Sequence, residues 1–194
     1  MVNKRTDYHP DFYKNQYYHV YNRAVGNDQL FYHEENYKYF LKRYSYYLSD
    51  KLKTYAFCLL PNHFHLLVSP SVNESEFIIE QFRKFFISYS ISFNKQQKRN
   101  GNLFQSNFKR KIIDNDNYLK QVVYYIHANP LHHSITIDFI KYKYSSYKKI
   151  LSTKITRLSR REVLEWFNGR KGFIKYHCKM KQYIFTEAYT IEDD

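Results

Sequence analysis

The chain has 194 residues, a net charge of +13 at pH 7 and a pI near 9.5. This length suits one domain with a C-terminal extension, and the charge indicates a polyanionic partner. With 22 tyrosines and 16 phenylalanines, the surface could both neutralise phosphates and stack on bases.

The two cysteines, Cys58 and Cys178, lack Cys-x-x-Cys spacing. This argues against a zinc ribbon and a disulfide scaffold, and it indicates a reducing compartment. The polar start has no apolar leader core, and no stretch approaches the length of a membrane span. We therefore expect a cytoplasmic protein, nucleoid-associated if its partner is DNA.

Hydrophobic periodicity and turn residues predict alternating strands and helices in the first 113 residues. In chain order these are a strand over 17–25, a helix over 34–48, strands over 53–60 and 63–70 joined by a turn at Pro61-Asn62, a helix over 75–93, and a strand over 109–113. This is the order of a ferredoxin-like α+β fold, with both helices on one face of an antiparallel sheet.

The strand over 63–70 carries two histidines spaced two residues apart. Side chains alternate along a strand, so if Phe64, Leu66 and Val68 face the helices, His63 and His65 face the other way. Two imidazoles on one face are suited to a divalent metal. The alternative is a pair of partly buried, hydrogen-bonded rings.

A third helix is predicted to cover the histidine face, opened by the capping residue Asp114 or Asn115 and stopped by Pro130. Residues spaced three or four apart on it form a polar and aromatic stripe. The members of this stripe are Tyr118, Gln121, Tyr125 and Asn129.

The remaining chain carries a basic and aromatic segment over 141–147 and then a capping box, Ser159-Arg160-Arg161-Glu162. This box predicts a helix through Phe167, ended by Gly169. We expect the acidic tail over 192–194 to be disordered. The domain boundaries are therefore placed at 1–150 for the main domain and 151–194 for a helical C-terminal extension.

Three motifs together resemble a known family. They are Leu60-Pro61-Asn62-His63-Phe64-His65-Leu66-Leu67, Gly101-Asn102-Leu103-Phe104-Gln105 and Tyr125-Ile126-His127-Ala128-Asn129-Pro130. In order and spacing they are similar to those of REP-associated tyrosine transposases, within the single-tyrosine HUH transposases, over about Tyr17 to Tyr147. The resemblance implies a metal-dependent endonuclease and strand transferase that cuts single-stranded, hairpin-forming DNA through a 5′-phosphotyrosine intermediate.

Phosphodiester cleavage needs charge stabilisation, and a divalent ion provides it. We expect His63 and His65 to bind Mg²⁺ or Mn²⁺, which prefer oxygen ligands, so a side-chain oxygen should complete the set. Asn129, one turn after Tyr125, is the predicted third ligand, directly or through a water. The similar family position often carries Gln.

Tyr125 is the predicted nucleophile, with Tyr124 and Tyr118 as alternatives. Tyr124 points about 100° away on the helical wheel, and the residue four positions after Tyr118 cannot bind metal. His127 is predicted to be structural or DNA-facing, and Asn62 to cap the turn before its strand.

A run of basic residues without an acidic interruption predicts the DNA-binding surface. Its members are Arg83, Lys84, Lys95, Lys98, Arg99, Lys109, Arg110 and Lys111. The alternative is a solvated basic helix end and loop.

Two other functions stay open: a non-catalytic, domesticated nucleic-acid-binding protein of the same fold, and a replication initiator or relaxase. The second usually has further domains. The oligomeric state is open between monomer and homodimer, as is the choice between a mobile-element and a host-resident role.

Overall fold

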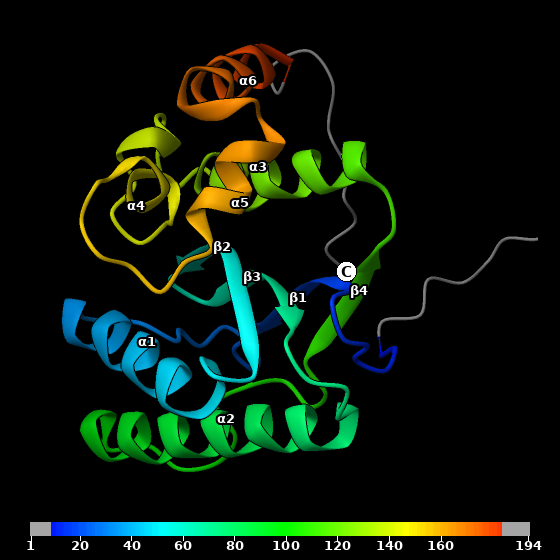
Figure 1. Ribbon diagram of the computed structural model, residues 1–194. Coiled ribbons are helices and arrows are strands. Elements are labelled where there is room, and N and C mark those ends of the chain that lie inside the picture. Colours follow the sequence, from blue (N-terminus) through cyan, green and yellow to red (C-terminus); the bar gives the residue numbers. More distant parts are fainter. Residues whose placement is uncertain (1–8, 184–194) are drawn as a thin grey trace, which may run out of the picture.

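The computed structural model describes residues 9–183 and shows one antiparallel sheet with helices on both faces (Figure 1). The elements are β1 (Tyr17–Arg23), α1 (Glu34–Leu48), β2 (Leu52–Leu60), β3 (His63–Pro70), α2 (Ser75–Gln97), β4 (Lys109–Ile113), α3 (Asp116–His132), the 3-10 helix η1 (Phe139–Lys141), α4 (Tyr147–Leu151), α5 (Arg160–Trp166) and α6 (Gly169–Tyr183). None of the helices within 9–183 has both the length and the apolar character needed to cross a bilayer.

The sheet has the strand order β2-β3-β1-β4, so the histidine strand β3 is central, as predicted. Leu60 pairs with His63, which closes the β2–β3 hairpin around Pro61 and Asn62. On the other side Tyr21 of β1 pairs with His65. The predicted ferredoxin-like α+β architecture is confirmed.

Each face of the sheet has its own apolar core. Phe64, Leu66 and Val68 of β3 pack with buried side chains of α1 and α2. Leu67 of β3 packs instead with α3 and the C-terminal helices, which cover the opposite face (Figure 1). Since side chains alternate, His63 and His65 emerge on the α3 face, as predicted.

The prediction that Pro130 stops the third helix is wrong, because α3 continues through Pro130 to His132. A proline removes one N–H donor and is costly mainly in a helix interior. Pro130 lies in the last turn of α3, two residues before the helix ends, so its missing N–H donor costs little there. The Pro130 carbonyl accepts from the N–H groups of Ile135 and Thr136. Of the two predicted caps, Asn115 is used, with its side chain accepting from the Tyr118 N–H.

The C-terminal extension also differs from the prediction. Gly169 ends no helix; it begins α6, which the sequence patterns did not reveal. Asn168 and Gly169 both have positive φ, 56° and 89°, and this tight turn lets a second helix follow α5 directly. Ser159 makes no side-chain capping hydrogen bond, so that part of the predicted capping box is absent. The predicted disordered tail lies outside the described residues.

Two element ends were also misplaced. Helix α2 runs to Gln97, past the predicted end at 93. Strand β1 ends at Arg23, since the next residues turn to meet the segment before β4. There, the Val25 N–H donates to the Leu103 carbonyl and the Gln105 N–H to the Arg23 carbonyl.

A buried polar chain joins α3 to the sheet and to α6. The His177 Nδ1–H donates to the Phe173 carbonyl, so its neutral ring accepts at Nε2 from His127 Nδ1, 3.0 Å away. His127 Nε2 then accepts from the Ser146 hydroxyl at 2.8 Å, and Ser146 Oγ accepts from the Phe57 N–H. His127 is fully buried, so of its two predicted roles the structural one is correct.

We expect His177→Leu to lower the free energy of unfolding by about 1–3 kcal/mol, because it leaves the buried His127 Nδ1–H without an acceptor. Urea unfolding at pH 7.5 measures this change. The exposed neighbour Cys178 provides the control, since Cys178→Ser should leave stability within about 0.5 kcal/mol. Equal stability of both variants would show that the hydrogen bond between His127 and His177 contributes nothing to the free energy of unfolding.

Candidate active site

A cleft of about 140 Å³ opens beside the start of β3, on the α3 face. Its walls come from four segments far apart in sequence: the end of β1, the start of β3, the loop before β4 with the first residue of that strand, and the C-cap of α3. The lining residues are Tyr21, Asn22, Arg23, Asn62, His63, Phe64, His65, Gln105, Ser106, Asn107, Lys109 and His133. The first two family-like motifs, around His63 and Gln105, therefore meet at one place.

His63 is oriented by two asparagines. Its Nδ1 lies 2.7 Å from Asn62 Oδ1, and its Nε2 lies 3.2 Å from Asn129 Oδ1. An amide oxygen only accepts and a neutral ring has one N–H, so His63 can donate to only one of these oxygens. The shorter contact, with Asn62, favours the proton on Nδ1 and leaves a lone pair on Nε2 beside Asn129 Oδ1. The prediction that Asn62 caps the turn is therefore corrected: its side-chain oxygen contacts the His63 ring instead.

His65 is almost fully buried, and its two nitrogens have different surroundings. Nδ1 lies 2.9 Å from Nε2 of His19, a residue on β1. Nε2 has no hydrogen-bond partner among the described residues, although it is buried. A buried nitrogen without a partner is uncommon in folded proteins and points to a ligand position.

Tyr125 brings its ring against the histidines from α3. Its centroid lies 5.7 Å from that of His65 and 5.9 Å from that of His19, edge to face in both pairs. The alternative Tyr124 faces away and packs against Tyr176 and His177. Of the two adjacent tyrosines, Tyr125 is thus the one beside the His63–His65 pair.

Burial keeps the histidines of the site neutral. It lowers the pKa of His63 to about 4, with the neighbouring His133 adding to the effect. Burial likewise holds the pKa of His65 well below its usual value, helped by His19 and His63. Neutral imidazole is the form that binds metal, so both rings are available as ligands at pH 7.

The donor set fits a divalent cation. His63 Nε2 of β3 meets Asn129 Oδ1 of α3, the ring of His65 lies 5.1 Å from that of His63, and His65 Nε2 is buried without a partner. Adjacent ligands of an octahedral Mg²⁺ lie about 3 Å apart, close to the 3.2 Å between His63 Nε2 and Asn129 Oδ1. Within 9–183, no cluster of three or more His, Cys, Asp or Glu is placed to hold an ion.

The sequence reading missed His19 and Tyr21 as neighbours of the site. Both lie on β1 at alternate positions, and Tyr21 pairs with His65 across the strands. The sequence shows that His19 and Tyr21 are two residues apart and so share a face of their strand. Only the pairing of β1 with β3 shows that this is the face of His65. At the end of α3, the ring of His132 lies 5.7 Å from that of Tyr125, and the ring of His133 lies 4.5 Å from that of His63.

The predicted DNA-binding residues separate into three groups: those on the α3 face of β4, those bonded inside the protein, and those at α2. Lys109 and Lys111 lie on the α3 face of β4, with their ammonium groups over the rings of Tyr21 and Tyr118. Arg110 points the other way and is buried, donating to the carbonyls of Pro10 and His9. Alternation along β4 thus brings the two lysines to the cleft side and uses the arginine in the core.

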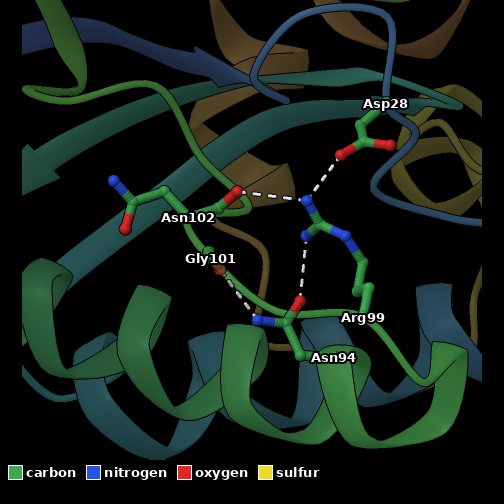
Figure 2. A network of polar contacts seen from close by, with 5 residues as sticks. All are labelled: Asp28, Asn94, Arg99, Gly101 and Asn102. Carbon is green, nitrogen blue, oxygen red and sulfur yellow. Dashed lines mark hydrogen bonds and ion pairs between the residues drawn. The ribbon is translucent and has the colours of Figure 1, made fainter.

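Arg99 has an internal role (Figure 2). Its guanidinium contacts Asp28 at 2.5 Å, the Asn94 side-chain oxygen at 2.9 Å and the Asn102 carbonyl at 3.2 Å, while Asn94 also binds the Gly101 carbonyl. This network ties the turn after β1 to the loop after α2. It holds the segment that leads to Gln105 at the rim of the cleft.

The other four predicted residues lie on α2 or, for Lys98, at its C-cap, and α2 covers the opposite face of the sheet from α3 (Figure 1). Arg83 and Lys84 both pair with Glu80, and Lys95 and Lys98 are exposed near the end of the helix. The structure does not bring these four side chains to the cleft.

Comparison with known proteins finds similarity in sequence to one curated protein and similarity in fold to solved structures. A curated protein of Haemophilus influenzae named REP-associated tyrosine transposase is 29% identical over 111 residues, which are 53% of this chain and 63% of that protein. A solved structure, a REP-associated tyrosine transposase bound to a REP hairpin, superposes with a TM-score of 0.64 at 16% identity, over 80% of this chain and 96% of that one. The resemblance to REP-associated tyrosine transposases is confirmed.

The two comparisons support different statements. The solved transposase, at 16% identity, shows the shared α+β fold. The Haemophilus transposase shows relationship in sequence, and the match spans less than two thirds of its length. No protein-family model matches the chain.

The buried neutral histidines predict how the stability of the metal-free protein depends on pH. Burial lowers the pKa of His19 and of His177 to about 3, against about 6.5 in the unfolded chain. The unfolded state therefore binds more protons below pH 6.5, so stability is full above this value and is lost as the pH falls toward 3.

We expect the free energy of unfolding to fall by about 1.4 kcal/mol per pH unit for each such histidine, once the pH is well below 6.5. Urea unfolding at pH 7.5, 6.5 and 5.5 measures the slope. His177→Leu removes one titrating ring and should therefore reduce the slope by about 1.4 kcal/mol per pH unit, the contribution of one proton. A flat profile between pH 7.5 and 5.5 would contradict the neutral, buried state.

Proposed function

We propose that the chain is a metal-dependent single-strand DNA endonuclease and strand transferase, a transposase that acts on hairpin DNA through a 5′-phosphotyrosine intermediate. One observation carries the proposal. The Tyr125 ring lies against His65, whose Nε2 is buried without a partner, and His63 Nε2 lies 3.2 Å from Asn129 Oδ1. A set of this kind suits phosphodiester chemistry, and a binding module has no use for it.

His63, His65 and Asn129 would hold Mg²⁺ or Mn²⁺, with Asn129 acting directly or through a water. The ion would supply a positive charge for the non-bridging phosphate oxygens. The protein's contribution is to keep the two imidazoles neutral and fixed. Asn62 does this for His63 through its 2.7 Å contact with Nδ1.

Tyr125 would be the nucleophile. Its phenol loses its proton, and the oxygen forms a bond to phosphorus as the bond from phosphorus to the 3′ oxygen breaks. The 3′ oxygen takes up a proton and leaves as a free hydroxyl, while the 5′ phosphate stays on the tyrosine. Attack of a 3′-hydroxyl on this ester reverses the step and joins the strand.

A single chain contains the whole proposed site. Helix α3 packs on β2 and β3 of its own sheet, so Tyr125 and the His63–His65 pair meet within one protomer. A monomer would then suffice for cleavage. Action on chromosomal repeats would place the protein with the nucleoid. The domain boundary at residue 150 stays a prediction.

For the chemistry, we expect Tyr125→Phe to abolish covalent attachment to DNA, by at least about 10³-fold, without weakening binding more than about twofold. The test incubates purified protein with single-stranded hairpin DNA from the flanks of its own gene, with Mn²⁺ or with chelator. A denaturing gel and peptide mass analysis then identify any adduct.

Tyr124→Phe is the matched control and should keep the adduct, because Tyr124 faces α6. An adduct that persists in Tyr125→Phe would contradict the assignment. Tight, salt-sensitive binding with no adduct on any hairpin tested would instead support the non-catalytic binding protein.

For DNA binding, Lys111 and Arg110 make a matched pair on one strand. We expect Lys111→Gln to weaken binding and to reduce the slope of log affinity against log salt by about one, with stability unchanged. Arg110→Gln should lower the stability and leave DNA binding and its salt slope unchanged, because the Arg110 guanidinium donates to carbonyls inside the protein. Binding titrations at several salt concentrations and urea unfolding measure the two effects. Equal effects of both variants would contradict the assignment.

A further inference from the structure

His19 is a buried imidazole on β1 that the proposed chemistry does not use. It is 2% exposed, and its Nε2 lies 2.9 Å from His65 Nδ1. The two ring centroids are 5.1 Å apart with planes 24° from parallel. With a 2.9 Å contact between nitrogens, this spacing means that the rings lie edge to edge, so the hydrogen bond lies near both ring planes.

This hydrogen bond can have only one direction if His65 is to bind a cation through Nε2. Either His19 Nε2–H donates to His65, or His65 Nδ1–H donates to His19. In the first case His65 would carry its proton on Nε2, as a buried donor without a partner. Unpaired buried N–H groups are rarer than unpaired acceptors, so the second case is favoured.

The surroundings of His19 keep it able to accept. A neutral imidazole has one nitrogen with a free lone pair, and the 2.9 Å contact brings Nε2 of the buried His19 ring to His65 Nδ1. Tyr21 packs against both rings, at 4.9 Å from His19 and 5.7 Å from His65. These contacts restrict rotation of either imidazole away from the shared hydrogen bond.

We infer that His19 is a positioning residue, which holds His65 in the Nδ1–H tautomer and so keeps the His65 Nε2 lone pair directed into the site. The inference rests on the proposed function for its purpose, since the tautomer matters only if His65 is a ligand. Asn62 and His19 would then share one task. Asn62 orients His63, and His19 orients His65.

The tautomer is measured directly in the metal-free protein. Two-bond proton–nitrogen correlation spectra of ¹⁵N-labelled protein distinguish Nδ1–H from Nε2–H imidazole, and His65→Gln assigns the signal. We expect His65 to be in the Nδ1–H form in the wild-type protein. Observation of the Nε2–H form would overturn the inference, whether or not the protein binds metal.

Variants of His19 test the consequence. His19→Phe keeps a ring but removes the acceptor, so the tautomer preference should be lost and the affinity for Mn²⁺ alone should fall 10- to 100-fold. His19→Gln can present an amide oxygen near the place of Nε2, and it should keep the tautomer and most of the affinity. An unchanged Mn²⁺ affinity in His19→Phe would contradict the positioning role.

Cys178→Ser is the control, because Cys178 is exposed on α6 and is not among the residues that line the cleft. It leaves the hydrogen bond between His19 and His65 in place, so the tautomer and the Mn²⁺ affinity should not change. The outcomes separate the two proposals. If wild-type protein binds no Mn²⁺ at His63 and His65, the proposed function fails, while the spectrum still decides the tautomer of His65.

Discussion

The strict alternation of side chains along β3 is the constraint on which the rest of the structure depends. Phe64, Leu66 and Val68 are buried under α1 and α2, so the histidines between them must face α3. A shift of one residue in pairing would move both histidines into the apolar core and the apolar residues onto the other face. Such a slip is strongly disfavoured because β3 is paired on both sides.

The second core turns this face into a site. Helix α3 buries an apolar stripe against the sheet, and the same helix carries Tyr125 and Asn129 to the histidines. Close packing fixes the rotation of the helix about its axis. The buried chain from Ser146 through His127 to His177 adds hydrogen bonds that have one direction only, and these tie α3 to both the sheet and α6.

Neutral, buried histidines are therefore used twice in this protein. Around His127 they act as hydrogen-bonding groups whose partners are complete. Around His65 one nitrogen lacks a partner, although the other is held by His19. The difference between a complete and an incomplete set of partners separates a structural histidine from a candidate ligand, and residue type alone does not show it.

Much of the fold could be predicted from sequence because it depends on local periodicity. The bounds of α1 and β4, the β2–β3 hairpin and the face of the histidines are as predicted. Errors fell where local rules compete with tertiary contacts. Pro130 was expected to end α3, but a proline near a helix end costs little. Gly169 was expected to end a helix, but it forms a turn between two.

Spacing within one element placed His63 with His65 and Tyr125 with Asn129, since residues at these spacings share a face, and the resemblance to REP-associated tyrosine transposases joined the two pairs into one candidate set. The sequence could not select among basic residues or find His19. Arg99 and Arg110 look like surface cations until their partners from distant segments are seen. His19 meets His65 only because β1 pairs with β3. What the sequence by itself determined was therefore the order and periodicity of the elements. Which side chains lack a partner was decided only by the tertiary structure, because hydrogen bonding and burial depend on contacts between distant parts of the chain.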